Sequence, residues 1–216
     1  SGAGMTTFYV GTVSGPSSIL VESNGVLDIN SSFSILGNNN GATNTLTVQS
    51  GGRATFDGNF ISFGYVAGST GQLNLNGTAG SRGVFETEQI EVGDGAGLID
   101  FDGGILRALA SESDFLKDFA AGGVTLGAGG GYIDSNGFNI TIAAPIDGAG
   151  TLVKQGAGTL TLSATNSYGN TAIQAGTLAI SSDANLGAGD VSLDGGELLA
   201  TASFTCRECW GIYWRC

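Results

Sequence analysis

The chain has 216 residues, among them 39 glycines and 2 prolines, and its 7 basic and 19 acidic residues give a net charge of −12 with no histidine. A negative field of that size repels phosphate backbones, so we expect no nucleic-acid partner. Without histidine, Ser-His-Asp and Cys-His catalysis are impossible, whereas the content of Leu, Ile, Val and Phe is sufficient for a hydrophobic core.

The first residues, SGAGM, are small and glycine-rich. We interpret residues 1–5 as a cloning scar, with a native glycine-rich start as the alternative, and predict that the folded segment covers residues 6–205. The longest apolar runs, such as residues 18–21, are far too short to span a membrane as a helix.

Four stretches share one design, in which a strand ends, a Gly-Gly or Asn-Gly turn follows and a new strand begins. They are VESNGVLDI (21–29), VQSGGRATF (48–56), FDGGILRAL (101–109) and LDGGELLAT (193–201). The first two begin 27 residues apart, and Leu46 and Leu73 are separated by the same interval. A period of this size indicates a stacked repeat.

Apolar and polar residues alternate in several short segments, which predicts strands with one face inward and one face in water. Short strands, glycine-rich turns and a period near 27 predict an all-β parallel β-helix of about eight coils, on the order of 40 Å long. A Greek-key sandwich is the alternative, because alternation does not fix connectivity. The expected inward ladder is Leu73, Leu75, Ile99, Phe101, Leu126, Ile133, Ile140, Ile142, Leu160, Leu162, Leu178 and Ile180.

One segment breaks the alternation. ASESDFLKDFAAG, residues 110–122, places Leu116, Phe119 and Ala120 at helical spacing, and Gly122 can end a helix. We predict a short helix or a compact loop folded onto the rod, with its aromatic residues serving in packing.

Residues 115–181 resemble the passenger domains of type V autotransporters. Within them, GAGTLVKQGAGTLTLSATNSYGNTAIQAGTL, at residues 148–178, is similar to the passenger-associated transport repeat, to which we assign residues 148–181. The residues that carry this resemblance are Gly148, Gly150, Leu152, Lys154, Gly156, Gly158, Thr159, Leu160, Thr161, Leu162, Asn166, Tyr168, Thr171, Gly176, Thr177 and Leu178. The loop ATNSYGN departs from the family pattern because it lacks the second glycine.

The resemblance implies a right-handed β-helix that is exported to the surface of a Gram-negative bacterium. It also implies adhesion or self-association, with host-cell or matrix receptors or other copies of the chain as partners, and with an outer-membrane translocator barrel as the export partner. The repeat would aid folding and export. In this reading, the Gly-Thr-Leu units are coil corners that lead into strands.

The last eleven residues, CRECWGIYWRC, contain Cys206, Cys209, Cys216 and both tryptophans. We interpret residues 206–216 as a non-native tail, with an appended cyclic peptide or a native end as the alternatives. Cys-x2-Cys suggests zinc, but a closed zinc site needs four ligands and the chain has no histidine.

Two carboxylate pairs could suggest a polysaccharide-cleaving enzyme, our alternative function. Asp100 with Asp102, and Glu86 with Glu88, are spaced i and i+2, or ~6.7 Å along a strand, which is compatible with an inverting glycosidase. The simpler interpretation is the solvated half of an alternating strand. We therefore predict a protein that is not an enzyme, with no catalytic, cofactor-binding or metal-ligating residue and no cofactor.

Overall fold

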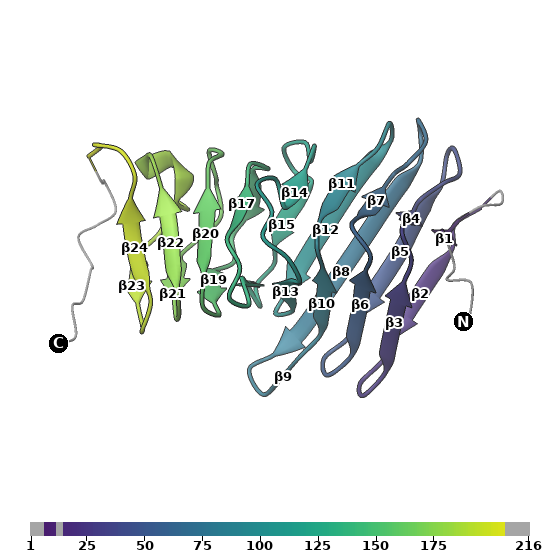
Figure 1. Cartoon of the computed structure of the whole chain (residues 1–216), viewed down its shortest axis with the longest axis horizontal. Helices are drawn as coiled ribbons and strands as arrows, with labels where there is room; N and C mark the ends of the chain where they lie inside the picture. The colour runs from purple at the N-terminus through teal and green to yellow at the C-terminus, as the bar shows by residue number, and fades with distance from the viewer. Residues whose placement is uncertain (1–6, 12–14, 206–216) are drawn as a thin grey trace.

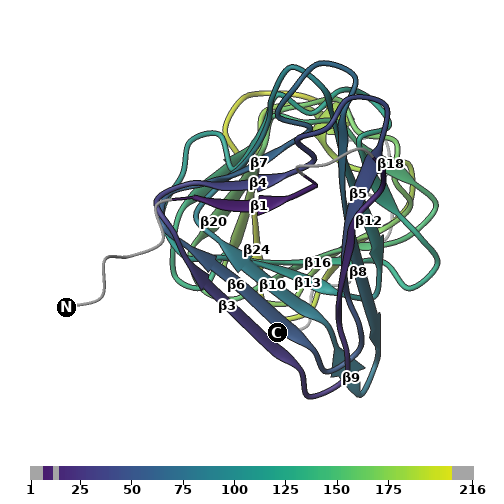
Figure 2. The ribbon, with the colours of Figure 1, turned by 90° about the vertical axis from the view of Figure 1, so that its right-hand side faces the viewer.

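The computed structural model describes residues 7–11 and 15–205. The predictions for residues 1–5 and 206–216 concern residues outside these ranges. The described chain winds into stacked coils, and each coil crosses three faces in turn (Figures 1 and 2).

The first face is a sheet of parallel strands, one from each of the first six coils; the last two described coils add no strand to it. Its strands are β2 (Ser18–Val21), β5 (Thr43–Val48), β8 (Thr70–Thr78), β12 (Ala96–Asp102), β15 (Val124–Leu126) and β18 (Ile146–Gly148). A two-residue strand, β9 (Ser81–Arg82), folds back antiparallel to the end of β8.

The second face is an eight-stranded parallel sheet. Its strands are β3 (Val26–Asn30), β6 (Arg53–Asp57), β10 (Val84–Thr87), β13 (Ile105–Ala108), β16 (Gly131–Asp134), β19 (Leu152–Gln155), β21 (Thr171–Ile173) and β23 (Val191–Leu193).

The third face consists of two sheets placed end to end. The first contains β1 (Phe8–Val10), β4 (Ser34–Leu36), β7 (Ile61–Phe63), β11 (Ile90–Val92) and β14 (Leu116–Lys117). The second contains β17 (Ile140–Ile142), β20 (Thr159–Leu162), β22 (Thr177–Ile180) and β24 (Glu197–Ala200). A 3-10 turn, η1 (Asp183–Asn185), lies between β22 and β23.

This arrangement is the predicted parallel β-helix. Viewed from the N-terminal end, the chain turns clockwise as it recedes, which is the right-handed sense (Figure 2). Strands of successive coils pair in parallel in all three faces, and the β8–β9 hairpin is the one antiparallel strand pair among the described residues, which excludes the Greek-key sandwich. In the described part of the chain, no helix has the length and apolar character needed to cross a membrane.

The core is one continuous apolar column enclosed by the three faces. All twelve residues of the predicted inward ladder are buried, each at 2 % exposure or less. Neighbours in the ladder stack in register, as Leu73 does on Ile99 and Leu160 on Leu178. Strict alternation thus identified the inward residues correctly, because successive side chains of a strand point to opposite sides.

The coils shorten towards the C-terminus. Leu46 pairs with Leu73, 27 positions later, as the sequence period predicted. Ile99 pairs with Val124, 25 positions later, and Leu160 pairs with Leu178, only 18 positions later. The first face accounts for much of the change, because its strands shrink from nine residues in β8 to three in β15 and β18, and no strand of this face is formed between β20 and β21. The single period of the sequence analysis therefore holds only for the N-terminal coils.

Residues 110–122 contain no helix. Glu112 forms a parallel bridge with Ile140, and Leu116 and Lys117 form β14, which pairs with β11. The segment is therefore part of a coil, and the helical alternative was wrong. Of the three residues at helical spacing, Leu116 and Phe119 are buried and Ala120 is exposed; Phe115 is buried beside them. Their role in packing is confirmed.

Candidate functional site

The Gly-Thr-Leu units occupy coil corners that lead into strands, as predicted. Leu152, Leu160 and Leu178 are buried, whereas the threonine before each is half-buried. Gly176 has a φ of +65°, and a Cβ added to it would lie 2.4 Å from the carbonyl oxygen of Gly158 in the preceding coil. The corner therefore requires glycine both for its backbone angle and for the close approach of two coils.

Lys154 is the most unusual residue of the repeat, because it points into the rod. It lies in register with Ile133 on one side and Ile173 on the other, and it is fully buried. Its ammonium nitrogen donates to the carbonyls of Gln155 at 2.9 Å, Gly156 at 2.7 Å and Ala175 at 3.1 Å. The lysine therefore joins two stacked corners from the inside.

The three carbonyls around Lys154 match the three protons of an ammonium group. Burial lowers the pKa of Lys154 to about 8, while the nearby Asp134 opposes the shift. The group is thus still mainly charged at neutral pH. The sequence contained a signal for this placement, since Lys154 is two positions after the inward Leu152, but its charge suggested an outward residue.

Two asparagines close the opposite corner of neighbouring coils. The side-chain oxygen of Asn166 accepts from the amide of Ile146 at 2.9 Å, and its nitrogen donates to the carbonyl of Asn185 at 2.5 Å. The Asn185 side chain accepts from Ser182 and donates to Ala164. Each asparagine thus replaces the backbone bonds that the turn cannot make.

Tyr168 completes the repeat coil. It is fully buried, and its hydroxyl lies 3.0 Å from the hydroxyl of Thr171. Burial raises the pKa of Tyr168 to about 12. A Cβ added at Gly187 in the following coil would lie 2.4 Å from the ring, so this coil packs directly on the tyrosine. The loop ATNSYGN therefore closes over a buried tyrosine ring.

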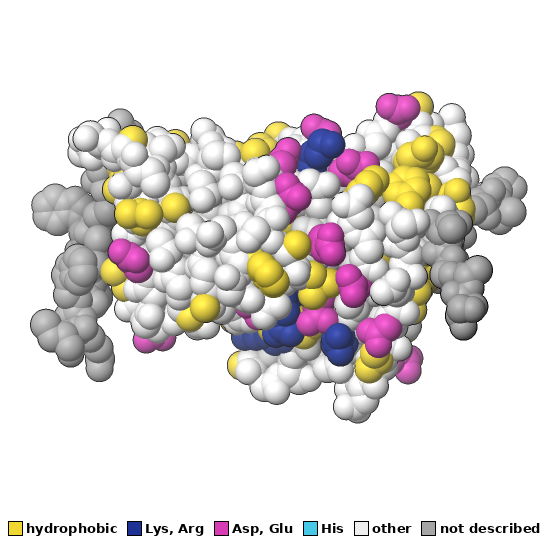
Figure 3. All heavy atoms as spheres, viewed as in Figure 1, with side chains coloured by type: hydrophobic (Ala, Val, Ile, Leu, Met, Phe, Trp, Pro, Cys, Tyr) yellow, Lys and Arg dark blue, Asp and Glu magenta, His cyan; other side chains and the backbone are white. Residues whose placement is uncertain are grey.

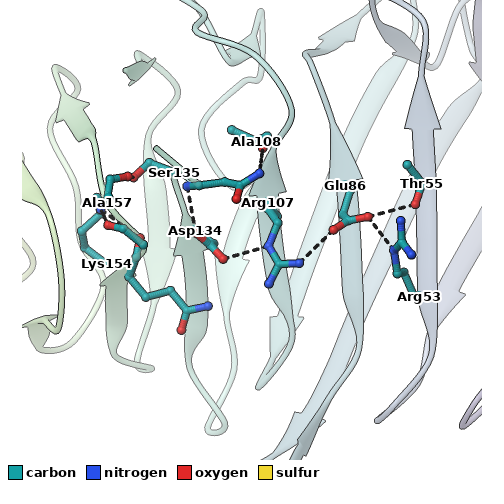
Figure 4. Close-up of polar contacts among 12 residues, drawn as sticks. Arg53, Thr55, Glu86, Arg107, Ala108, Asp134, Ser135, Lys154 and Ala157 are labelled. Atoms are coloured by element: carbon teal, nitrogen blue, oxygen red, sulfur yellow. Dashed lines mark hydrogen bonds and ion pairs between the residues drawn. The ribbon is translucent and has the colours of Figure 1, made fainter. Parts of the chain in front are cut away.

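A ladder of alternating charges crosses the outside of the second face (Figure 4). Glu86 accepts from Arg53 at 2.6 Å, Arg107 at 2.8 Å and Thr55 at 2.9 Å, and Arg107 also donates to Asp134 at 2.8 Å. Burial alone would raise the pKa of Glu86, but the hydrogen bonds from the two arginines and Thr55 together lower it. Basic and acidic side chains gather over this face (Figure 3).

The first face carries a row of neutral and acidic polar side chains, which we call the first-face row. It consists of Thr47, Gln72, Asn74, Asp100 and Thr125, one or two residues from each of four coils. Asn74 donates to Thr47 at 3.1 Å, and Gln72 donates to both Asn74 and Asp100. The hydroxyl of Thr125 donates to Asp100. The row is therefore a continuous hydrogen-bonded strip that faces solvent.

The candidate acids of the enzyme alternative lie within these hydrogen-bonded rows. Asp100 and Asp102 are on the same side of β12, but Asp100 is bonded to Gln72 and Thr125, and Asp102 accepts from the amide of Gly129 at 2.7 Å. Glu86 is in the charge ladder, and Glu88 lies just past the end of β10. The structure therefore gives Asp100, Asp102 and Glu86 structural partners.

Among residues 7–11 and 15–205, no group of three or more His, Cys, Asp or Glu side chains is placed to hold a metal ion. The cysteines of the Cys-x2-Cys motif lie outside the described residues.

The fold and these outer rows define a class: a parallel β-helical rod with an apolar core, glycine-rich coil corners and long polar faces. Comparison with known proteins gives two matches. Residues 152–180 match the family model of the passenger-associated transport repeat, within the segment assigned from the sequence. The chain is also 35 % identical over 143 residues to the adhesin BmaC autotransporter of Brucella suis biovar 1 (strain 1330), covering 63 % of this chain and 4 % of that protein.

No solved structure matches the chain. The family model and the relative identify the chain as a segment of an autotransporter passenger that contains a passenger-associated transport repeat. Its location is therefore that of a secreted passenger at the bacterial cell surface. The segment corresponds to only 4 % of the length of the curated relative.

Proposed function

We propose that this rod is a surface-exposed stalk that acts in adhesion or self-association, and not as an enzyme. Its partners would be host-cell or matrix receptors or other copies of the chain, and it would be exported by an outer-membrane translocator barrel of its own protein. The observation that carries the proposal is the first-face row. It presents hydroxyl, amide and carboxylate groups in register along the rod, which suits many modest contacts over a large area.

The name of the relative, an adhesin, supports this reading. The alternative, a polysaccharide-cleaving β-helix, needs carboxylates that are free to exchange protons with a substrate. Asp100 and Glu86 instead accept several hydrogen bonds from neighbouring coils. Their placement supports a structural role.

For the repeat coil, we propose a role in folding during export. The ammonium group of Lys154 is completed by Ala175, and the amide of Asn166 by Asn185, each from the next coil. Buried polar groups without a hydrogen-bond partner raise the free energy of the folded coil. Lys154 and Asn166 therefore each favour folding of the next coil, which supplies the missing partner. The coil would thus act as a template on which the adjoining coil folds as the chain emerges.

Display of the passenger on a non-adherent bacterium tests the adhesive role. Replacing Thr47 and Thr125, the half-buried threonines at the two ends of the first-face row, by lysine should reduce attachment and aggregation. The matched control replaces Asn30 and Ser192, exposed residues of the second face, by lysine, which changes the net charge by the same amount. Equal adhesion of both double variants would contradict the assignment to the first face.

The enzyme alternative has its own test. Purified chain is incubated with acidic and neutral polysaccharides, and reducing ends are measured. Release of reducing ends that disappears in the Asp100→Asn/Asp102→Asn variant would overturn the adhesin proposal. We expect no release from either protein.

A further inference from the structure

A polar hollow of about 450 Å³ opens on the third face, where its two sheets meet. It is lined by Ser111, Glu112, Ser113, Asn139, Ile140, Thr141 and Thr161. The volume is within the range of ~300–1,000 Å³ that is typical of small-molecule sites. Part of its wall is the segment that interrupts the alternation of the sequence.

The hollow results from a bulge in the backbone. Glu112 donates to Asn139 at 3.0 Å, and Thr141 donates to Glu112 at 2.9 Å. The next bond, from Phe115 to Thr141 at 2.8 Å, comes three residues after Glu112. In a regular parallel ladder this bond would come from residue 114, two positions after Glu112, so the segment contains one extra residue relative to the neighbouring coil. Bulges of this kind commonly re-aim side chains at binding sites.

The lining has hydrogen-bonding capacity that the described residues do not use. Thr141 and Thr161 are paired on neighbouring strands, and no described residue bonds to either hydroxyl. The side-chain oxygen of Asn139 accepts from Thr159 at 3.1 Å, which leaves its NH₂ group for a ligand. One carboxylate oxygen of Glu112 accepts from Asp114 at 3.2 Å, and the other has no partner among the described residues.

We propose that this hollow binds the ring of a neutral sugar. A sugar ring presents neighbouring hydroxyls, each both a donor and an acceptor, and the free oxygen of Glu112 can accept from one while Asn139 donates to another. Thr141 and Thr161 can pair with the remaining hydroxyls. The carboxylate disfavours anionic ligands such as uronic acids through like-charge repulsion.

This site lies on a different face from the first-face row, so its failure would leave the adhesion proposal standing. The hollow is open and its lining contains no aromatic side chain, so a single site should bind weakly. Many copies of the passenger on one cell would raise the overall attachment through multivalency.

The test uses the 216-residue chain and saturation-transfer NMR with methyl glycosides of glucose, galactose and mannose, beside glucuronic and galacturonic acid. We expect binding of at least one neutral glycoside and weaker binding of the uronic acids. Thr141→Val and Thr161→Val, which keep the side-chain shape, and Glu112→Gln should each weaken binding by about tenfold or more. Thr45→Val, on the first face, is the matched control and should bind normally.

Circular dichroism and melting temperatures establish that each variant is folded. The proposal is overturned if no neutral glycoside binds, or if binding persists unchanged in the Thr141→Val, Thr161→Val and Glu112→Gln variants. A preference for uronic acids over neutral sugars would also overturn it, because it contradicts the role of Glu112.

Discussion

The ammonium nitrogen of Lys154 lies 3.1 Å from the carbonyl oxygen of Ala175, a residue one coil further along the rod. Because the lysine also bonds to the carbonyls of Gln155 and Gly156, its removal leaves three acceptors at a buried corner. Lys154→Met keeps most of the apolar stem and removes only the charged end. We expect it to lower the free energy of unfolding by about 2–4 kcal/mol, measured by urea denaturation.

The matched control for this change is Lys117→Met. Lys117 pairs with Glu91 at 3.2 Å, and its side chain is 42 % exposed. Exposed ion pairs contribute little to stability, so this variant should be nearly as stable as the parent chain. Similar losses for the two lysines would contradict a special role for the buried one.

The lowered pKa of Lys154 also predicts a dependence on alkaline pH. In the folded chain the group loses its proton near pH 8, whereas in the unfolded chain it does so near 10.5. Between these values the unfolded state binds more protons, so the contribution of Lys154 to stability rises with pH. Unfolding free energies measured from pH 8 to 10 should rise more steeply in the parent chain than in Lys154→Met. Parallel curves would contradict the shift.

The sequence predicted the inward apolar column well and the polar network poorly, for a physical reason. The alternation within one strand is enough to predict that Leu160 and Leu162 point inward, and no information about neighbouring coils is needed. The charge ladder depends on the offset between coils, which is 31 positions from Thr55 to Glu86 but 21 from Glu86 to Arg107. The hairpin of β8 and β9 extends one coil and makes these offsets unequal, so a fixed period of 27 could not bring the partners together.

The register of the core is tested by two neighbouring residues of β20. Leu160 is fully buried between Ile140 and Leu178, whereas Thr161 is half-buried on the outside. Leu160→Asp places an unpaired charge in the apolar column and should cost more than about 4 kcal/mol. Thr161→Asp should change stability by less than about 1 kcal/mol. Thermal melts compare the two, and equal losses would contradict the inward position of Leu160.

The corner glycines can be separated into those needed for backbone angle and those also needed for space. Gly176 and Gly137 both have positive φ, +65° and +90°, but a Cβ at Gly137 would meet no atom within 4 Å. Gly137→Ala should therefore cost only the backbone strain, about 1–2 kcal/mol. Gly176→Ala adds a clash with the carbonyl of Gly158 and should cost at least twice as much, as measured by urea denaturation. The reverse order would contradict the close stacking of these corners.

The charge ladder predicts how acid affects the second face. The lowered pKa of Glu86 means that the folded state holds its carboxylate ionised more strongly than the unfolded state does. Its contribution to stability is therefore full above the unfolded pKa of about 4.3 and is lost as the pH falls through the lower folded value. Glu86→Gln should cost about 2–4 kcal/mol at pH 7, because Arg53 and Arg107 lose a buried partner.

Below the folded pKa of Glu86, the parent chain has lost the same charge, so the difference between the two proteins should shrink steadily from pH 5 to pH 2. The matched control is Glu91→Gln, whose only ion pair in the described chain is with the largely exposed Lys117. It should cost less than about 1 kcal/mol at pH 7. Chemical denaturation at several pH values measures both variants. A difference for Glu86→Gln that stayed constant into acid would mean that the glutamate stabilises the face through its shape and not through its charge.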